Sequence, residues 1–325
     1  MITVLSEADI AAIALPQDII RTAVEAGLQA QSEGRALAEP TSVFNPVPGR
    51  DDLIAVIRGA LPDQRLALVK TVGGFPGNAA KGRVTNPGCL TLIETETGQI
   101  TGLLAAARIT TERTAMVTAI GAHCLARHGA RVLGVMGTGG IAVAAARYIA
   151  QAMPMSEIRL HGRDPARSAD VASTLSAELG VPVITSPDWA TCIGGADIVI
   201  DGTALPRDIP LFPAEAISAG ALVIVFGAYS SLPVDIMDHT DRVVMDRWVA
   251  DGRGALGPQI STGEVTEARL DALIGDVIGG RAAPRATDMD RIIFCHRGVA
   301  ACDLALANAY LDVARERNLG TQILF

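Results

Sequence analysis

The chain has 325 residues, which is enough for two domains of ordinary size with hydrophobic cores. Apolar residues make up 49% of it and charged residues 19%, which excludes a disordered chain. The net charge is −8 and no Lys/Arg-rich run is present, so a nucleic-acid partner is excluded, because phosphate contacts need clustered cations. No apolar run reaches the roughly 20 residues of a membrane span, so no membrane partner is expected either.

The five cysteines are scattered along the chain, and none forms the Cys-x-x-Cys pair that is typical of a zinc site. We therefore expect no metal site. The N-terminus carries no secretory signal, so the cysteines are expected to be reduced thiols of a cytoplasmic protein.

In the first third of the chain, the residue pattern changes from one typical of helices to one typical of strands. Residues 3–34 are predicted to be helical, with Ser6 as a cap, Pro16 opening a second helix and Gly34 as the end. From residue 41 to 102, Gly, Pro and Asn turn signals separate short strand-like runs, which predicts a sheet with one or two helices. These runs are Leu53–Arg58, Leu66–Thr71, Cys89–Glu94 and Gly102–Ala106.

The middle of the chain alternates between strands and helices after a helix predicted over 111–128. Such alternation is typical of an α/β fold with a doubly wound parallel sheet of the Rossmann type. A long Ala-rich helix over about 298–318 is expected to pack back onto the N-terminal half, which would make the first domain discontinuous. The expected strands are Val132–Met136, Ile158–His161, Val181–Thr185, Asp197–Asp201 and Leu222–Phe226, and the helices lie over 140–152, 165–179, near 187–193 and near 213–218.

A glycine turn joins the first of these strands to its helix. Gly137, Thr138, Gly139, Gly140 and Ile141 stand where the backbone of a Rossmann domain turns tightly beside a pyrophosphate. The following helix N-terminus offers free N–H groups to that anion. The strand, the turn and the helix come in the required order, so the sequence predicts a bound nicotinamide dinucleotide.

The end of the second strand selects between the two nicotinamide cofactors. Asp164 is suited to the ribose hydroxyls of NAD and would repel a 2′-phosphate, whereas the adjacent Arg163 would favour NADP or stack on the adenine. NAD(H) is therefore favoured, and NADP(H) stays open as an alternative.

Several motifs carry a resemblance to a known family. Arg108-Ile-Thr-Thr-Glu-Arg-Thr-Ala115 runs into an Ala-rich helix and the glycine turn, Leu68-Val-Lys70 is followed by Asn78 and Lys81-Gly82, and Ala196–Thr203 and Gly220–Gly227 follow later. The chain resembles the ornithine cyclodeaminase/μ-crystallin family over almost its whole length. Members of that family include cyclodeaminases with tightly bound NAD, alanine dehydrogenases, and reductases of ketimines and cyclic imines.

The resemblance implies a domain organisation and partners. It places a Rossmann domain over residues 118–298 and a discontinuous α+β substrate-binding and dimerisation domain over residues 1–117 and 299–325. It implies a homodimer that acts on a small imino or amino acid, with Thr203 and Gly227 at the cofactor. Lys70 and Arg113 match the family's cationic pair for the substrate α-carboxylate, a role that suits a bidentate guanidinium and a nearby ammonium.

The chain departs from the family at three places. Tyr229 stands where cyclodeaminases and alanine dehydrogenases have an Asp, so cyclodeamination is in doubt. Thr41 replaces a common Arg while Arg58 appears nearby, and His296 and Arg297 occupy a loop that faces the substrate in the family. Additional cations suit a substrate with a second carboxylate.

These departures predict an oxidoreductase that reduces an imino acid, and the first choice of substrate is iminosuccinate, which would yield L-aspartate. Lys70, His296 and Tyr229 are the candidates for managing the proton on nitrogen, with Arg58, Arg113 and Arg297 as further substrate-binding cations. A monocarboxylic imine, or a keto acid with ammonia, is the alternative substrate. The alternative functions are those of an NAD-recycling cyclodeaminase and of a non-catalytic binding protein.

Overall fold

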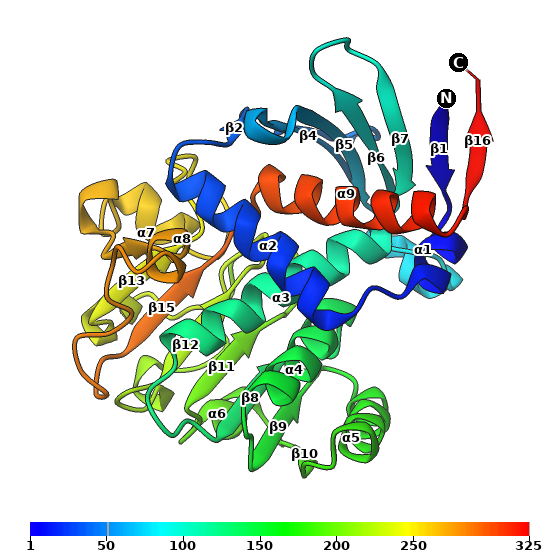
Figure 1. Ribbon diagram of the computed structural model, residues 1–325. Helices are drawn as coiled ribbons and strands as arrows, with labels where there is room; N and C mark the ends of the chain where they lie inside the picture. The colour runs from blue at the N-terminus through cyan, green and yellow to red at the C-terminus, as the bar shows by residue number, and fades with distance from the viewer. Residues whose placement is uncertain (51, 325) are drawn as a thin grey trace. The chain divides into compact units, whose positions relative to one another are not determined.

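The computed structural model describes residues 1–50 and 52–324 (Figure 1). Its contacts divide the chain into two compact units. Unit 1 consists of Met1–Arg113 and Gly298–Phe325, and unit 2 is Thr114–Arg297. Unit 1 is therefore built from two segments that are far apart in the sequence.

Unit 1 contains an eight-stranded sheet that is mostly antiparallel, with the order β16-β1-β7-β6-β5-β4-β2 and β3 paired to β4. The expected strand runs of this region all form strands. The sheet consists of β1 (Ile2–Leu5), β2 (Leu37–Ala38), β3 (Ser42–Phe44), β4 (Leu53–Leu61), β5 (Leu66–Gly74), β6 (Gly88–Glu94), β7 (Ile100–Ala105) and β16 (Thr321–Ile323). In the described part of residues 41–102, where one or two helices were expected, the strands are joined by the 3-10 turns η1 (Pro62–Gln64) and η2 (Pro76–Lys81) and no α-helix forms.

The helical expectation for the N-terminus is wrong for its first residues. Ile2–Leu5 forms β1, which pairs in parallel with β7 and antiparallel with β16. These partners come from remote parts of the chain, so the short run gave no local sign of them. Helix α1 (Glu7–Ile13) then starts at Ser6, whose side chain accepts a hydrogen bond from the Asp9 N–H, as the cap prediction required.

Two long helices of unit 1 pack closely together. Figure 1 shows α2 (Gln17–Ser32) beside α9 (Ala300–Glu316), which also contacts β4, β5 and β6. A Cβ atom at Gly27 would lie 2.7 Å from the Cys302 backbone nitrogen, so glycine is needed for this approach. The C-terminal helix thus covers the strands that carry Lys70.

Unit 2 is a doubly wound α/β domain, as predicted, and its sheet has the order β10-β9-β8-β11-β12-β15-β13-β14. All of its strand pairs are parallel. The strands are β8 (Val132–Met136), β9 (Glu157–His161), β10 (Val183–Thr185), β11 (Ile198–Asp201), β12 (Leu222–Val225), β13 (Arg242–Met245), β14 (Ala272–Leu273) and β15 (Ile292–Cys295). The order reverses at β8, and ligands of such sheets bind beyond the carboxyl ends of the strands at this point.

The helices of unit 2 follow its strands along the chain. The segment expected as a helix near 213–218 forms only the 3-10 turn η3 (Ala214–Ala216), and β13, β14 and β15 were not anticipated. Helix α3 (Ala107–Leu125) begins in unit 1 and ends in unit 2. The others are α4 (Gly140–Ala152), α5 (Pro165–Leu179), α6 (Trp189–Ile193), α7 (Gly257–Thr262) and α8 (Ile274–Ile278). Within the described residues, no helix has the length and apolar character to cross a membrane.

Candidate functional site

The glycine turn lies between β8 and α4, at the reversal of strand order. Gly137 has a φ of +104°, and a Cβ atom there would lie 2.7 Å from the carbonyl oxygen of Gly202. A Cβ at Gly139 or Gly140 would instead meet no heavy atom within 4 Å. No side chain caps the start of α4 at Gly139, so the N–H groups of its first turn suit an anion such as a diphosphate. The turn therefore fits a dinucleotide.

Asp164 has a structural role at the end of β9. Its carboxylate caps α5 by accepting hydrogen bonds from the N–H groups of Ala166 at 3.0 Å and Arg167 at 3.2 Å. Arg163 is exposed beside it. The guanidinium of Arg167, which sequence reasoning did not single out, donates to the carbonyl oxygen of Thr138 at 3.1 Å. The first turn of α5 is thereby connected to the glycine turn.

The last residue of the chain's fourth Rossmann strand, two positions before Thr203, was also overlooked. Asp201 ends β11 and accepts from the Thr203 N–H at 3.0 Å and the Thr203 hydroxyl at 2.7 Å. The Ser231 hydroxyl donates to its other oxygen. Burial raises the pKa of Asp201, although the bonds from Ser231 and Thr203 oppose the rise. Thr203 is thus held rigidly, and Gly227 follows β12, the neighbouring strand, half-buried.

Three buried charges form the centre of unit 1. One oxygen of Asp303, in the first turn of α9, accepts from Lys70 Nζ at 2.8 Å and from Arg113 Nε at 2.9 Å. The side chain of Lys70 is 0% exposed and that of Arg113 10%. We call Lys70, Arg113 and Asp303 the clamp. The sequence motifs indicated its two cations, but they gave no sign that Asp303 joins them.

The clamp shifts the pKa values of its members. Burial lowers the pKa of the Lys70 ammonium to about 8; Asp303 opposes this change and Arg113 adds to it. Burial alone would raise the pKa of Asp303, but the charges of Arg113 and Lys70 hold it below its usual value. Asp303 is therefore expected to be ionised throughout the pH range around 8 in which Lys70 is expected to titrate.

The structure does not bring Arg58 to the clamp. In the β4–β5 pair, Ile57 lies opposite Lys70 and Arg58 lies opposite Val69. Because directly opposite residues of a pair share a face and successive residues alternate, Arg58 points to the other face of the sheet from Lys70. Its side chain is exposed there.

His296 is buried in unit 2. Its ring stacks on Phe226 with centroids 5.0 Å apart, and its Nε2 lies 2.9 Å from the Thr118 hydroxyl. That hydroxyl also donates to the Thr114 carbonyl oxygen at 3.1 Å. Which of Nε2 and the Thr118 hydroxyl donates depends on the tautomer of His296. Nε2 of His296 thus already has a hydrogen-bond partner within unit 2.

The remaining two predicted residues lie in unit 2 as well. Tyr229 is 43% exposed after β12. Arg297 forms a bidentate ion pair with Asp251, with N–O distances of 3.0 and 3.3 Å. Its guanidinium therefore already has a carboxylate partner, although the Asp251 side chain is 41% exposed.

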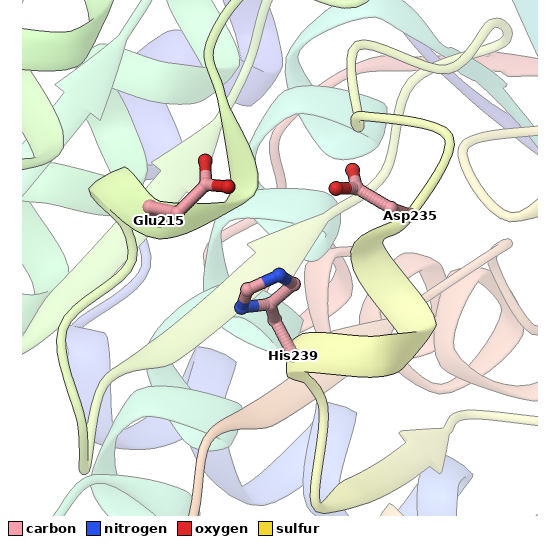
Figure 2. Close-up of side chains that lie close together, drawn as sticks. All are labelled: Glu215, Asp235 and His239. Carbon is pink, nitrogen blue, oxygen red and sulfur yellow. The ribbon is translucent and has the colours of Figure 1, made fainter.

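One group of possible metal ligands lies apart from these residues. Figure 2 shows the side chains of Glu215, Asp235 and His239 pointing toward a common space, and their ligand atoms lie within 4.8 Å of one another. They come from η3 and from the turn η4 (Ile236–His239) with its preceding residue. Glu215 and Asp235 are exposed, and exposed carboxylates commonly gather without an ion, so we assign them no role.

Comparisons with known proteins cover the whole chain. The sequence model of the "Ornithine cyclodeaminase/mu-crystallin family" matches residues 3–318. A Delta(1)-pyrroline-2-carboxylate/Delta(1)-piperideine-2-carboxylate reductase of Azospirillum brasilense is 31% identical over 264 residues, which are 78% of this chain and 79% of the relative.

Two solved structures share the fold. The Delta(1)-pyrroline-2-carboxylate reductase of Thermococcus litoralis, in complex with NADH and L-proline, superposes with a TM-score of 0.90 at 20% identity, covering 99% of this chain and 100% of that one. The iminosuccinate reductase of Paracoccus denitrificans, in complex with NAD+, has a TM-score of 0.86 at 22% identity, covering 100% and 99%.

Proposed function

Because the chain belongs to the ornithine cyclodeaminase/mu-crystallin family, we propose that it is an NAD(H)-dependent reductase of α-imino acids. The observation that carries the proposal is the buried clamp, in which two cations share one carboxylate oxygen of Asp303. Burying these charges without a function would be costly, and together they suit a substrate carboxylate. The relative from Azospirillum brasilense is named as a reductase of two cyclic imino acids.

The reaction adds a hydride to the imine carbon and a proton to its nitrogen. When bound, reduced nicotinamide supplies the hydride. In the proposal, Gly137, Thr138, Gly139, Gly140 and Ile141 hold the diphosphate, with Arg163, Asp164, Thr203 and Gly227 as further cofactor contacts. Arg113 binds the substrate carboxylate as a fork, and Lys70, His296 and Tyr229 are the possible sources of the proton.

The charges of the clamp favour a substrate with one carboxylate. Lys70 and Arg113 carry two positive charges and Asp303 one negative charge, so the protonated clamp leaves one positive charge to balance a substrate. Arg58, expected to bind a second carboxylate, points to the opposite face of its sheet, and Arg297 is paired with Asp251. We therefore place a monocarboxylic, cyclic imine first.

Iminosuccinate, reduced to L-aspartate, is the second candidate. It is favoured by the exposure of Asp251, because a solvated ion pair is weak and a substrate carboxylate could compete for Arg297. The iminosuccinate reductase of Paracoccus denitrificans has the same fold.

We further propose that two copies of the chain form a dimer through unit 1. Large apolar side chains are exposed on or beside its strands β2, β3 and β4, where a monomer would leave them in water. These are Leu37, Val43, Phe44, Val47 and Leu53.

A substrate comparison tests the activity. The purified protein is given NADH with Delta(1)-pyrroline-2-carboxylate, Delta(1)-piperideine-2-carboxylate, pyruvate plus ammonia, or oxaloacetate plus ammonia, and NADH loss is followed. We expect steady consumption with the highest kcat/KM for a cyclic imine. Preference for the oxaloacetate-derived imine would favour iminosuccinate instead. Conversion of L-ornithine without net NADH loss would show a cyclodeaminase, and cofactor binding without turnover on any substrate would show a binding protein.

A further inference from the structure

The lysine of the clamp is unusual for this chain. The sequence has 27 Lys and Arg residues, and only Lys70 and Lys81 among them are lysines. An arginine keeps its charge when buried, whereas the pKa of a buried lysine shifts readily. An ammonium at the fully buried position 70 therefore supplies something that the otherwise preferred guanidinium cannot, namely a proton that can leave.

The surroundings of Lys70 make Asp303 its decisive partner. Within the sheet, the residues directly opposite Lys70 are Ile57 on β4 and Leu90 on β6, and both are apolar. The charged groups that face it are Asp303 from α9 and Arg113 from α3, and these act in opposite directions. Without Asp303, two buried cations would repel each other with no anion between them.

His296 is a weaker source of protons by comparison. Its Nε2 already has a hydrogen-bond partner, the Thr118 hydroxyl at 2.9 Å. Lys70 carries three protons, and its bond to Asp303 uses one of them.

We propose that Asp303 is a positioning residue, which holds Arg113 for the substrate carboxylate and keeps Lys70 oriented and protonated as the donor to the substrate nitrogen. The donor role rests on the proposed imine reduction. In that reaction the carbon gains a hydride, the nitrogen gains one proton from Lys70 Nζ, and the neutral amine of Lys70 is reprotonated from water. Asp303 touches neither reacting atom.

The two-lysine composition permits a direct test on the full-length protein. Protein labelled with [ε-13C]lysine gives two side-chain signals, assigned with Lys81→Arg, and their shifts are followed against pH. In the wild type we expect the Lys70 midpoint near pH 8, while exposed Lys81 provides the reference. Asp303→Asn removes a charge that raises the Lys70 pKa, so its midpoint is expected to fall by roughly one unit or more.

Glu112→Gln is the matched control. Glu112 is also a buried carboxylate of unit 1, on α3 next to Arg113, but it accepts from Arg108 Nε at 2.7 Å and from the Tyr310 hydroxyl at 2.5 Å. We expect this variant to leave the Lys70 midpoint unchanged. If Asp303→Asn does not fold, Asp303→Ser, which leaves room for water beside both cations, carries the same test.

The pH profile of kcat/KM connects the titration to the reaction. A donor must be protonated, so activity is expected to fall as pH rises through the Lys70 pKa, and the fall moves to lower pH in Asp303→Asn. Asp303→Glu restores the negative charge, so the fall in kcat/KM is expected to return toward the pH at which it occurs in the wild type.

The proposal and the proposed function can fail separately. The positioning role is overturned if the wild-type Lys70 midpoint lies at the ordinary lysine value, or if the midpoint is the same in the wild type and in Asp303→Asn. A midpoint that responds to Asp303 while the kcat/KM profile stays fixed overturns the donor role. Absence of imine reduction with a responsive midpoint leaves Asp303 as the positioning residue and rejects imine reduction as the function.

Discussion

Gly137 and Gly139 stand two residues apart in one turn, but their substitution by alanine is expected to have different results. At Gly137 the φ of +104° and the carbonyl oxygen of Gly202 at 2.7 Å both oppose a Cβ atom. Gly137→Ala is therefore expected to lower the free energy of unfolding by roughly 1–3 kcal/mol. Urea unfolding measures this loss.

Gly139→Ala serves as the comparison. Its new Cβ atom would meet no protein atom within 4 Å, and its φ of −74° suits alanine, so the free energy of unfolding is expected to change by less than about 0.5 kcal/mol. The methyl group would lie where we propose that the diphosphate binds, so NADH affinity is expected to fall roughly tenfold. Unchanged affinity in a folded Gly139→Ala protein would contradict the assignment of this turn to the cofactor.

Two of the three arginines that the sequence assigned to the substrate are expected to differ sharply when they are replaced by alanine. Arg113→Ala removes a partner of a buried carboxylate, so kcat/KM is expected to fall about 100-fold or more while NADH affinity is kept. Arg58→Ala, on the opposite face of the sheet, is expected to change kcat/KM less than about twofold. Equal losses of kcat/KM in the two variants would contradict the conclusion that Arg58 lies on the face of the sheet away from the substrate.

At the scale of elements, Asp164 at the start of α5 is expected to affect both the stability of the helix and the preference for NADH over NADPH. Asp164→Ala removes the cap and is expected to cost about 1 kcal/mol, whereas Asp164→Ser keeps a capping oxygen and is expected to preserve the Tm. Both variants remove the negative charge beside Arg163 and are expected to raise the use of NADPH relative to NADH. Thermal unfolding measures the change in stability, and the kcat/KM values for NADH and NADPH measure the cofactor preference. An unchanged ratio of these two values would show that Asp164 does not select between the cofactors.

Elements set by local patterns were predictable. The sequence placed β8, α4 and α5 with the bounds that the structure has, because each strand, turn and cap signal is contained in its own segment. β1, β13 and β14 were missed because these short strands depend on partners that come from elsewhere in the chain. Periodicity in a four-residue run cannot distinguish a strand from the start of a helix.

The same distinction applies to the candidate site. Lys70, Arg113 and the glycine turn were found from motifs, but 233 residues separate Lys70 from Asp303, so no spacing rule connects them. The face on which Arg58 lies depends on the register of β4 with β5, which becomes visible only once the strands are paired.

At the scale of the whole molecule, assembly is open to test. Phe44→Glu introduces a charge among the exposed apolar side chains of unit 1, so a dimer that uses this surface is expected to dissociate. Ile184→Glu, at an exposed apolar position of β10 in unit 2, is the control and is expected to stay dimeric. Light scattering after size-exclusion chromatography measures both masses; a Phe44→Glu dimer would place the interface elsewhere.

The order in which the chain is synthesised gives the two-segment construction of unit 1 a consequence for the living cell. A ribosome produces Lys70 and Arg113 early, then all of unit 2, and only afterwards the helix that carries Asp303. During that interval the two cations of the nascent chain have no native anion between them, and the strand at residues 2–5 has no β16 beside it. A translation product that stops before α9 would contain the glycine turn of unit 2 but a clamp without its carboxylate, so we expect it to bind cofactor without reducing a substrate.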